Sequence, residues 1–259
     1  MSAPAPRPVT ASASVLLAPN PGPMTLDGTN TWVLRAPGEA DCLVVDPGPL
    51  DEGHLAAVAA AGAVQLIVLT HGHADHSEGA ARLAELTGAP VLSMDPQWTT
   101  QGLEPLRTDG ETVGVTGLDV TVIRTPGHTS DSVSLLLAEA DGTRAVLTGD
   151  TVLGRGTTVV AHPDGVLGDY LASLERLREL GDATVLPGHG PELPSAGRAA
   201  AHYLEHRRAR LEQVRRAVAD GARTAPEVVE VVYADVDRVL WPAAELSVRA
   251  QLQHLGLPA

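Results

Sequence analysis

The chain has 259 residues and a formal net charge of −14, and 44% of its residues are hydrophobic while 19% are charged. These values are ordinary for a globular protein. Its 18 basic residues are all arginine, which excludes a lysine Schiff base or a lysine phosphate ligand from any mechanism. The single Cys42 excludes a disulfide within the chain. Because no apolar stretch approaches the roughly 18 residues of a membrane span and the start lacks a signal-peptide core, we expect a cytoplasmic protein without membrane partners.

The first two thirds of the chain alternate short apolar strands with turns and helices. Residues 1–12 are rich in Pro, Ala and Ser and predict a loose N-terminal segment. The elements expected after it are strands at 15–17, 32–34, 43–45, 66–69 and 91–92, helices at 55–61 and 80–86, a strand-rich stretch at 111–148, and an αβ unit at 169–186. This mixed order predicts α/β layers around a sheet.

Beyond Pro194 the pattern becomes helical. It predicts a long helix over residues 199–219, a short helix that starts with a capping box at Thr224, and a third helix from Pro242 through Leu255. We therefore expect a main domain over residues 13–197 and a helical C-terminal domain over residues 198–259.

A group of metal-ligand side chains directly follows the strand that ends at Leu69. Four such side chains occur within six positions: His71, His73, Asp75 and His76. Imidazole and carboxylate groups suit zinc and, less selectively, manganese or iron. We interpret the segment as a metal site in a loop at the edge of a sheet.

Three later positions repeat this arrangement, in which an apolar strand is followed by a turn that presents one ligand. They are His128 after Val122-Ile123, Asp150 after Val146-Leu147, and His189 after Val185-Leu186. Each alone is equally well explained by ordinary turn chemistry. Together with the first four they form a set of seven candidate ligands.

The order of these seven residues resembles that of the metallo-β-lactamase-fold hydrolases, over residues 13 to about 195. The resemblance implies an α/β (α+β) fold, a four-layer αβ/βα sandwich, whose catalytic domain holds two divalent metal ions. We expect Zn²⁺, with Mn²⁺ or Fe as alternatives. By position, the ligands of the first metal would be His71, His73 and His128, and those of the second Asp75, His76 and His189, with Asp150 bridging. An Asp at position 150 resembles the glyoxalase II and nuclease branches, because true β-lactamases usually have Cys there.

Further motifs are similar to those of the β-lactamase-like protein 2 group, so that the resemblance spans nearly the whole chain. They are Asn20-Pro21-Gly22, Gly28 to Thr31, Gly154 to Thr158, Asp169-Tyr170 and His206-Arg207. In that group an endoribonuclease acting on single-stranded RNA is known, and the C-terminal piece is a small winged-helix-like domain. The resemblance therefore implies a winged-helix-like fold for residues 198–259.

Such a site implies hydrolysis. Two metals about 3.5 to 4 Å apart share a water and lower its pKa toward 7, so we expect a bridging hydroxide as the nucleophile. Asp75 is the candidate for orienting it and handling its proton. Asp46, at the end of a strand, is either an acceptor for a ligand histidine or a turn residue. Substrate contacts are expected from Asn30, Arg155, Thr157 and Tyr170, each of which has loop chemistry or packing as its alternative.

Three functions remain open. The first is a hydrolase of a small ester, thioester or lactone, and the second is a single-strand-specific endoribonuclease with the same metal site. The third is a non-catalytic nucleic-acid-binding or metal-sensing protein, which an intact ligand set disfavours. Glyoxalase II proper is disfavoured because its basic glutathione-binding tail cannot be identified and the chain has no lysine.

The net negative charge of the chain disfavours the endoribonuclease, because RNA is a polyanion. This argument does not decide between the two functions. Between Arg198 and Arg216, however, six arginines face two glutamates, which is either a phosphate-binding patch or a solvated helix face. The last helix contains only Arg249 and Glu245 as charged residues, so we expect no DNA binding. The C-terminal domain is expected to cover the active site or to form a homodimer contact through Leu246, Ala250 and Leu257, and packing within the core of the small domain is the alternative for these residues.

Overall fold

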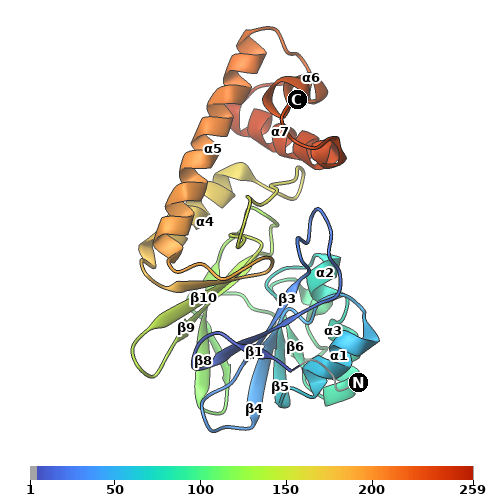
Figure 1. Ribbon diagram of the computed structural model, residues 1–259, viewed down its shortest axis with the longest axis vertical. Coiled ribbons are helices and arrows are strands. Elements are labelled where there is room, and N and C mark those ends of the chain that lie inside the picture. The colour runs from blue at the N-terminus through green and yellow to red at the C-terminus, as the bar shows by residue number, and fades with distance from the viewer. Residues whose placement is uncertain (1–4, 259) are drawn as a thin grey trace.

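Two β-sheets pack face to face in the computed structural model, which describes residues 5–258 (Figure 1). The first sheet has the order β1-β2-β3-β4-β5-β6, formed by β1 (Arg7–Pro8), β2 (Ala13–Leu17), β3 (Asn30–Leu34), β4 (Asp41–Val45), β5 (Ala63–Val68) and β6 (Val91–Leu92). The second has the order β11-β10-β9-β8-β7, formed by β7 (Thr112–Val115), β8 (Leu118–Arg124), β9 (Val133–Ala138), β10 (Arg144–Gly149) and β11 (Thr184–Pro187). The pairs β4–β5, β5–β6 and β10–β11 are parallel.

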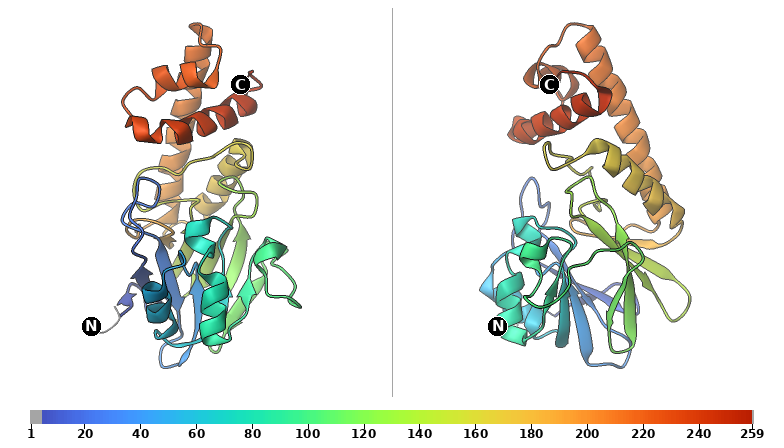
Figure 2. Two further views of the ribbon diagram at one scale, coloured as in Figure 1. Left: turned by 90° about the vertical axis from the view of Figure 1, so that its right-hand side faces the viewer. Right: turned by 180° about the vertical axis from the view of Figure 1, so that it is seen from behind.

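Helices cover the outer face of each sheet (Figure 2). The helices of the whole described chain are α1 (Glu52–Ala59), α2 (Ala74–Ser77), α3 (Ala80–Thr87), η1 (Pro96–Trp98), α4 (Leu167–Glu179), α5 (Ala196–Ala219), α6 (Ala225–Val232), η2 (Arg238–Leu240) and α7 (Trp241–Leu255). Apolar residues of α1 and α3 pack on the first sheet, and those of α4 and α5 pack on the second. The predicted four-layer αβ/βα sandwich is therefore confirmed. Among residues 5–258, no helix is both long and apolar enough to cross a membrane.

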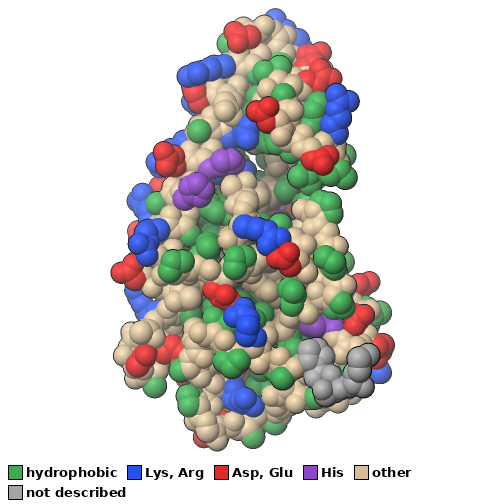
Figure 3. Space-filling view, in the orientation of Figure 1, with side chains coloured by type: hydrophobic (Ala, Val, Ile, Leu, Met, Phe, Trp, Pro, Cys, Tyr) green, Lys and Arg blue, Asp and Glu red, His purple; other side chains and the backbone are tan. Residues whose placement is uncertain are grey.

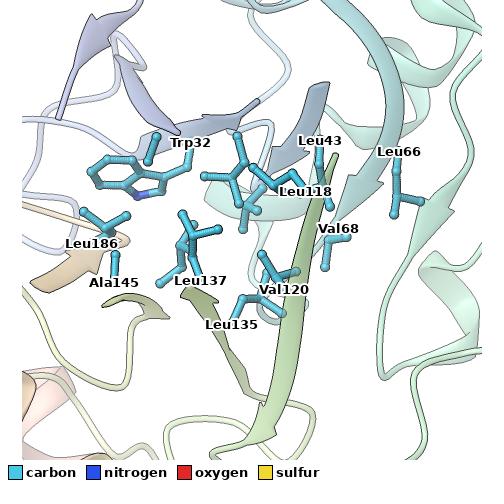
Figure 4. Packing of buried hydrophobic residues seen from close by; sticks show 14 of the residues in the cluster. Trp32, Leu43, Leu66, Val68, Leu118, Val120, Leu135, Leu137, Ala145 and Leu186 are labelled. Atoms are coloured by element: carbon cyan, nitrogen blue, oxygen red, sulfur yellow. The ribbon is translucent and has the colours of Figure 1, made fainter. Parts of the chain in front are cut away.

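The main core lies between the two sheets (Figure 4). Alternate residues of facing strands point inward, as the two-residue period of a strand requires: Leu43 and Val45 on β4, Val120 and Val122 on β8. Trp32 is 2% exposed, and its indole Nε1 donates a hydrogen bond of 3.1 Å to the carbonyl of Pro187. The indole therefore fills the core and also connects β3 of the first sheet to the end of β11 in the second.

The N-terminal segment corrects one expectation. Residues 1–4 lie outside the described part of the chain, but Arg7–Pro8 form β1, which pairs antiparallel with β2. The segment predicted as loose over residues 1–12 therefore contains an edge strand. Proline is tolerated there, because one side of an edge strand needs no hydrogen-bond donor.

The C-terminal domain has its own small core, formed by α6, α7 and the second half of α5. The first half of α5 packs on α4, so this helix continues from the sandwich into the C-terminal domain across the boundary predicted at residue 198. In Figure 1 it runs upward from the sandwich to α6 and α7. Ala250, expected on an exposed apolar face, is instead buried in the cluster around α4 and α5, whereas Leu246 is exposed.

Replacing Trp32 by alanine should lower the free energy of unfolding by about 3 to 5 kcal/mol, the usual effect of truncating a buried aromatic side chain. Urea denaturation followed by circular dichroism measures this change. The control Leu17→Ala removes a half-exposed side chain from the neighbouring strand and should change stability by less than about 0.5 kcal/mol. Equal effects of the two substitutions would contradict the assigned core.

Candidate metal centre

The seven candidate ligands meet at one edge of the sandwich. The segment from His71 to His76 follows β5, His128 follows β8, Asp150 follows β10, and His189 follows β11. Part of the segment predicted as a loop is in fact the single helical turn α2, with His73 at its N-cap. Nε2 of His76 lies near Asp150, and Oδ2 of Asp75 lies near His189, so this turn brings both side chains close to residues that follow strands of the second sheet.

Three histidine rings form one half of the cluster. The Nε2 atoms of His71 and His128 each lie 3.0 Å from Nδ1 of His73. The three nitrogens lie within 4.8 Å of one another, close enough to coordinate one ion. His71 and His128 are buried, whereas His73 is exposed, so this half of the cluster opens to solvent on the His73 side.

Asp75, His76 and His189 form the other half. Oδ2 of Asp75 lies 3.1 Å from Nε2 of His189 and 3.4 Å from Nε2 of His76. Asp150 lies between the halves, with Oδ1 3.4 Å from Nε2 of His76 and Oδ2 3.7 Å from Nε2 of His128. This is the arrangement that a carboxylate shared by two ions requires.

The outward nitrogen of each buried histidine faces an oxygen acceptor. Nδ1 of His128 faces the Val159 carbonyl at 2.7 Å, and Nδ1 of His189 faces the Gly28 carbonyl at 3.1 Å. Nδ1 of His71 faces Oγ1 of Thr70 at 3.0 Å, and Nδ1 of His76 faces Asp46 at 2.8 Å. Each Nδ1–H is therefore the donor, and each Nε2 points into the cluster, where it can offer a lone pair once it carries no proton.

Asp46 supports both halves of the cluster. Its Oδ2 accepts the Nδ1–H of His76 and, at 2.7 Å, the hydroxyl of Thr70, while its Oδ1 accepts the Thr70 amide at 2.7 Å. The same Thr70 hydroxyl accepts from His71. Of its two expected roles, Asp46 therefore takes that of acceptor for a ligand histidine. Sequence reasoning missed Thr70, although it directly precedes the ligand motif.

Burial and the neighbouring carboxylates shift the pKa values of these residues in opposite directions. Burial and the nearby rings of His76 and His128 hold the pKa of His71 well below its ordinary value. Burial alone would lower the pKa of His76, but the carboxylates of Asp150 and Asp46 together raise it well above that value. For His189, hydrogen bonds to Asp150 and Asp75 outweigh burial and raise the pKa to about 9.

The donor set fits divalent ions. Lone-pair-bearing nitrogens about 3 Å apart repel unless a proton or a cation lies between them. Oδ1 of Asp150 is buried without a hydrogen-bond partner among the described residues, an arrangement that is costly unless a cation is bound. Gly188 makes this proximity feasible, because a Cβ there would lie 2.5 Å from that same oxygen. Imidazole and carboxylate together match zinc, manganese or iron.

A cavity of about 330 Å³ opens beside the cluster, lined by His128 and Asp150 on one side and by the C-terminal helices on the other. Arg155 and Thr157 line it, as expected for substrate contacts, although Arg155 forms an exposed ion pair with Asp27. Sequence reasoning placed Arg207 in a charged stretch and in a motif of the resemblance, and missed that its side chain is buried in this wall.

Two predicted substrate contacts are corrected. The side-chain amide of Asn30 donates to the carbonyls of Pro187 and Gly190, at 3.0 and 2.9 Å, and so fixes the turn that holds His189. The hydroxyl of Tyr170 is buried and donates to the Thr151 carbonyl at 2.7 Å. Both residues hold loops around the cluster rather than facing the cavity.

Comparison with known proteins gives the family. Residues 24–189 match the model of the metallo-beta-lactamase superfamily, and residues 224–256 match that of the beta-lactamase associated winged helix domain. The chain belongs to the metallo-beta-lactamase superfamily. As the ligand set and the fold indicate, it is a metal-dependent hydrolase of that superfamily, with a winged-helix domain at its C-terminal end.

The proteins that are similar to this chain do not all carry the name of one activity. A "Beta-lactamase-like protein 2 homolog" of Caenorhabditis elegans is 33% identical over 93% of this chain and 82% of that protein. An "Atrochrysone carboxyl ACP thioesterase" of Aspergillus fumigatus is 34% identical over 84% of this chain and 72% of that protein. A solved beta-lactamase domain protein from Burkholderia ambifaria has a TM-score of 0.81 at 24% identity, over 97% of this chain and 87% of that one. The shared fold thus includes the C-terminal domain.

Replacing Asp46 by asparagine should weaken metal binding by about 10- to 100-fold, the usual effect of losing a partner behind a ligand. Asparagine also tolerates the left-handed backbone of this position, where φ is 52°, so the fold should be kept. Metal retention during dialysis against a graded chelator series measures the change. Asp119→Asn, on an exposed strand position, is the control and should bind metal as the unmodified protein does. Equal retention by both variants would contradict the role of Asp46.

Zinc binding should release protons and should weaken as pH falls from about 9 to about 6. At neutral pH the rings of His76 and His189 carry protons in the metal-free protein, because their pKa values are raised, and the ion must displace these protons. Isothermal titration calorimetry in buffers of different ionisation enthalpy counts the released protons. An affinity independent of pH over this range would contradict the assigned protonation.

Proposed function

We propose that this chain is a dinuclear metal hydrolase of a small thioester, ester or lactone. The observation that carries the proposal is that a cavity of about 330 Å³ has His128 and Asp150 in its wall. That volume lies at the small end of ligand sites. A reactive carbonyl can therefore reach the cluster while the rest of a small substrate is enclosed.

Two ions would be held by this chain's own residues. His71, His73 and His128 would bind one, Asp75, His76 and His189 would bind the other, and Asp150 would contact both. Zinc is the proposed metal, because neutral imidazole and carboxylate suit it best. Two such ions would acidify a shared water and polarise the carbonyl under attack.

Asp75 is proposed to orient the attacking water. Burial opposes its ionisation, but hydrogen bonding to His189 and the charge of His76 lower its pKa overall, so the carboxylate stays ionised and accepts a hydrogen bond. It is partly exposed beside the cluster, within reach of an incoming water. Hydrolysis of a thioester forms a bond between the water oxygen and the acyl carbon and breaks the C–S bond. The products are a carboxylate, a thiol that takes one proton of the water, and one released proton.

The distribution of arginines supports a small substrate over RNA. On α5, Arg208 pairs with Glu175, and Arg215 and Arg216 pair with Glu212. These side chains form a solvated helix face, which was one of the two interpretations of the stretch from Arg198 to Arg216; the other was a phosphate-binding patch. Carboxylates thus neutralise three of the six arginines on this helix, which leaves fewer free cations for a track along the backbone of a single strand. The thioesterase named among the relatives supports acyl chemistry.

The zinc-loaded protein should hydrolyse an acyl thioester of N-acetylcysteamine, and Asp75→Ala should lower kcat/KM by at least about 100-fold. Release of thiol, followed with a chromogenic disulfide, measures the rate, and Asp119→Asn is the control. Metal content is measured on each sample, since loss of metal alone would also abolish activity. Chelator-sensitive cleavage of single-stranded RNA without thioester turnover would overturn the proposal in favour of the endoribonuclease.

A further inference from the structure

Arg207 is a buried cation without an anionic partner. Its side chain is 4% exposed, and no carboxylate of residues 5–258 forms an ion pair with it. One of its Nη atoms donates to the Thr158 carbonyl, and its guanidinium lies over the ring of Tyr170, 5.1 Å from the centroid. Its Nε is buried and has no hydrogen-bond partner in the described part of the chain. A donor of a charged group is thus left unsatisfied in the wall of the cavity.

A second arginine of α5 and a neighbouring histidine line the same wall. Arg210 lies over the ring of Tyr233 at 4.3 Å and donates to Gln213 at 2.9 Å, again without a carboxylate among the described residues. His206, directly before Arg207 on α5, has a buried Nδ1 with no hydrogen-bond partner among the described residues, and burial and the two arginines lower the pKa of its ring. Asp150 is the one carboxylate among the lining residues of this cavity, and its charge belongs to the metal cluster.

A buried, unpaired guanidinium is costly, because water no longer solvates the charge. The cost is offset when a ligand supplies the counter-charge, and Arg binds carboxylates through paired N–H groups. Part of the remaining wall is apolar and includes Met24, Leu153 and Val236. Figure 3 shows the surface hollowed between the C-terminal helices and the sandwich, where such a ligand would enter.

We propose that Arg207, assisted by Arg210, forms a subsite for a carboxylate on the acyl part of the substrate. The substrate is then a short acyl thioester or ester with an anionic end. Its scissile carbonyl lies at the metal cluster, its apolar segment lies against the aliphatic wall, and its carboxylate lies against α5. This inference rests on the proposed hydrolase function and narrows its substrate class.

The test compares two N-acetylcysteamine thioesters of equal chain length, glutaryl and pentanoyl, which differ by a terminal carboxylate. In the zinc-loaded protein we expect kcat/KM for the glutaryl thioester to exceed that for the pentanoyl thioester by about tenfold or more. Arg207→Gln and Arg210→Gln should each reduce this ratio toward one, and Arg207→Lys should retain part of it. Arg208→Gln, on the exposed side of the same helix, should leave the ratio unchanged.

Binding to the metal-free protein tests the subsite without any turnover. Calorimetric titration with glutarate should show affinity at least about fivefold weaker in Arg207→Gln than in Arg208→Gln. If neither thioester is hydrolysed but this difference holds, the proposed function fails and the subsite stands. Equal glutarate affinity in the two variants, or equal hydrolysis of both thioesters by the unmodified protein, would overturn the subsite. Melting temperatures exclude misfolding of Arg207→Gln, and the half-buried Arg210→Gln provides an independent measurement.

Discussion

The hydrogen bonds of one buried carboxylate, that of Asp46, determine how the whole metal centre is held. Asp46 directly follows β4 and accepts from the amide and hydroxyl of Thr70, which follows the parallel neighbour β5, and from His76 on α2. The ends of two strands and one helical turn are thus fixed to a single charge. Because that charge is 1% exposed, its three donors are needed to offset desolvation, so the geometry has little freedom.

The opposite side of the cluster depends on how the two sheets pack. The turns of the second sheet supply His128, Asp150 and His189. These residues reach the His71–His76 segment only if the two sheets pack in one relative position. Two residues of β3 fix this relative position near the metal cluster: Trp32 and Asn30 both donate to the carbonyl of Pro187, two residues before His189. The core and the metal site therefore depend on each other. Packing of the two sheets determines where the ligand residues lie, and hydrogen bonds determine how each histidine ring is oriented.

Local patterns in the sequence were sufficient to predict the seven candidate metal ligands and the layers of helices and strands. Apolar strands followed by a single His or Asp indicated the metal edge, because the ends of neighbouring strands gather at one side of a sheet. The resemblance then supplied the topology. The roles of Asn30, Tyr170 and Arg207 depend instead on partners far along the chain, such as Pro187, Thr151 and Thr158. No local pattern encodes such pairings, and these are the residues whose roles were corrected or missed.

Net charge also proved less informative than the position of each charge. The value of −14 is spread over a solvated surface, where water and salt screen it within about 10 Å. Inside the cavity the screening is weaker, so an unpaired guanidinium there outweighs many distant carboxylates. The same helix illustrates both situations: Arg208 and Arg216 are exposed and paired, while Arg207 points inward. An acidic protein can therefore hold an anionic substrate, provided that the cation which binds it is buried where the reaction takes place.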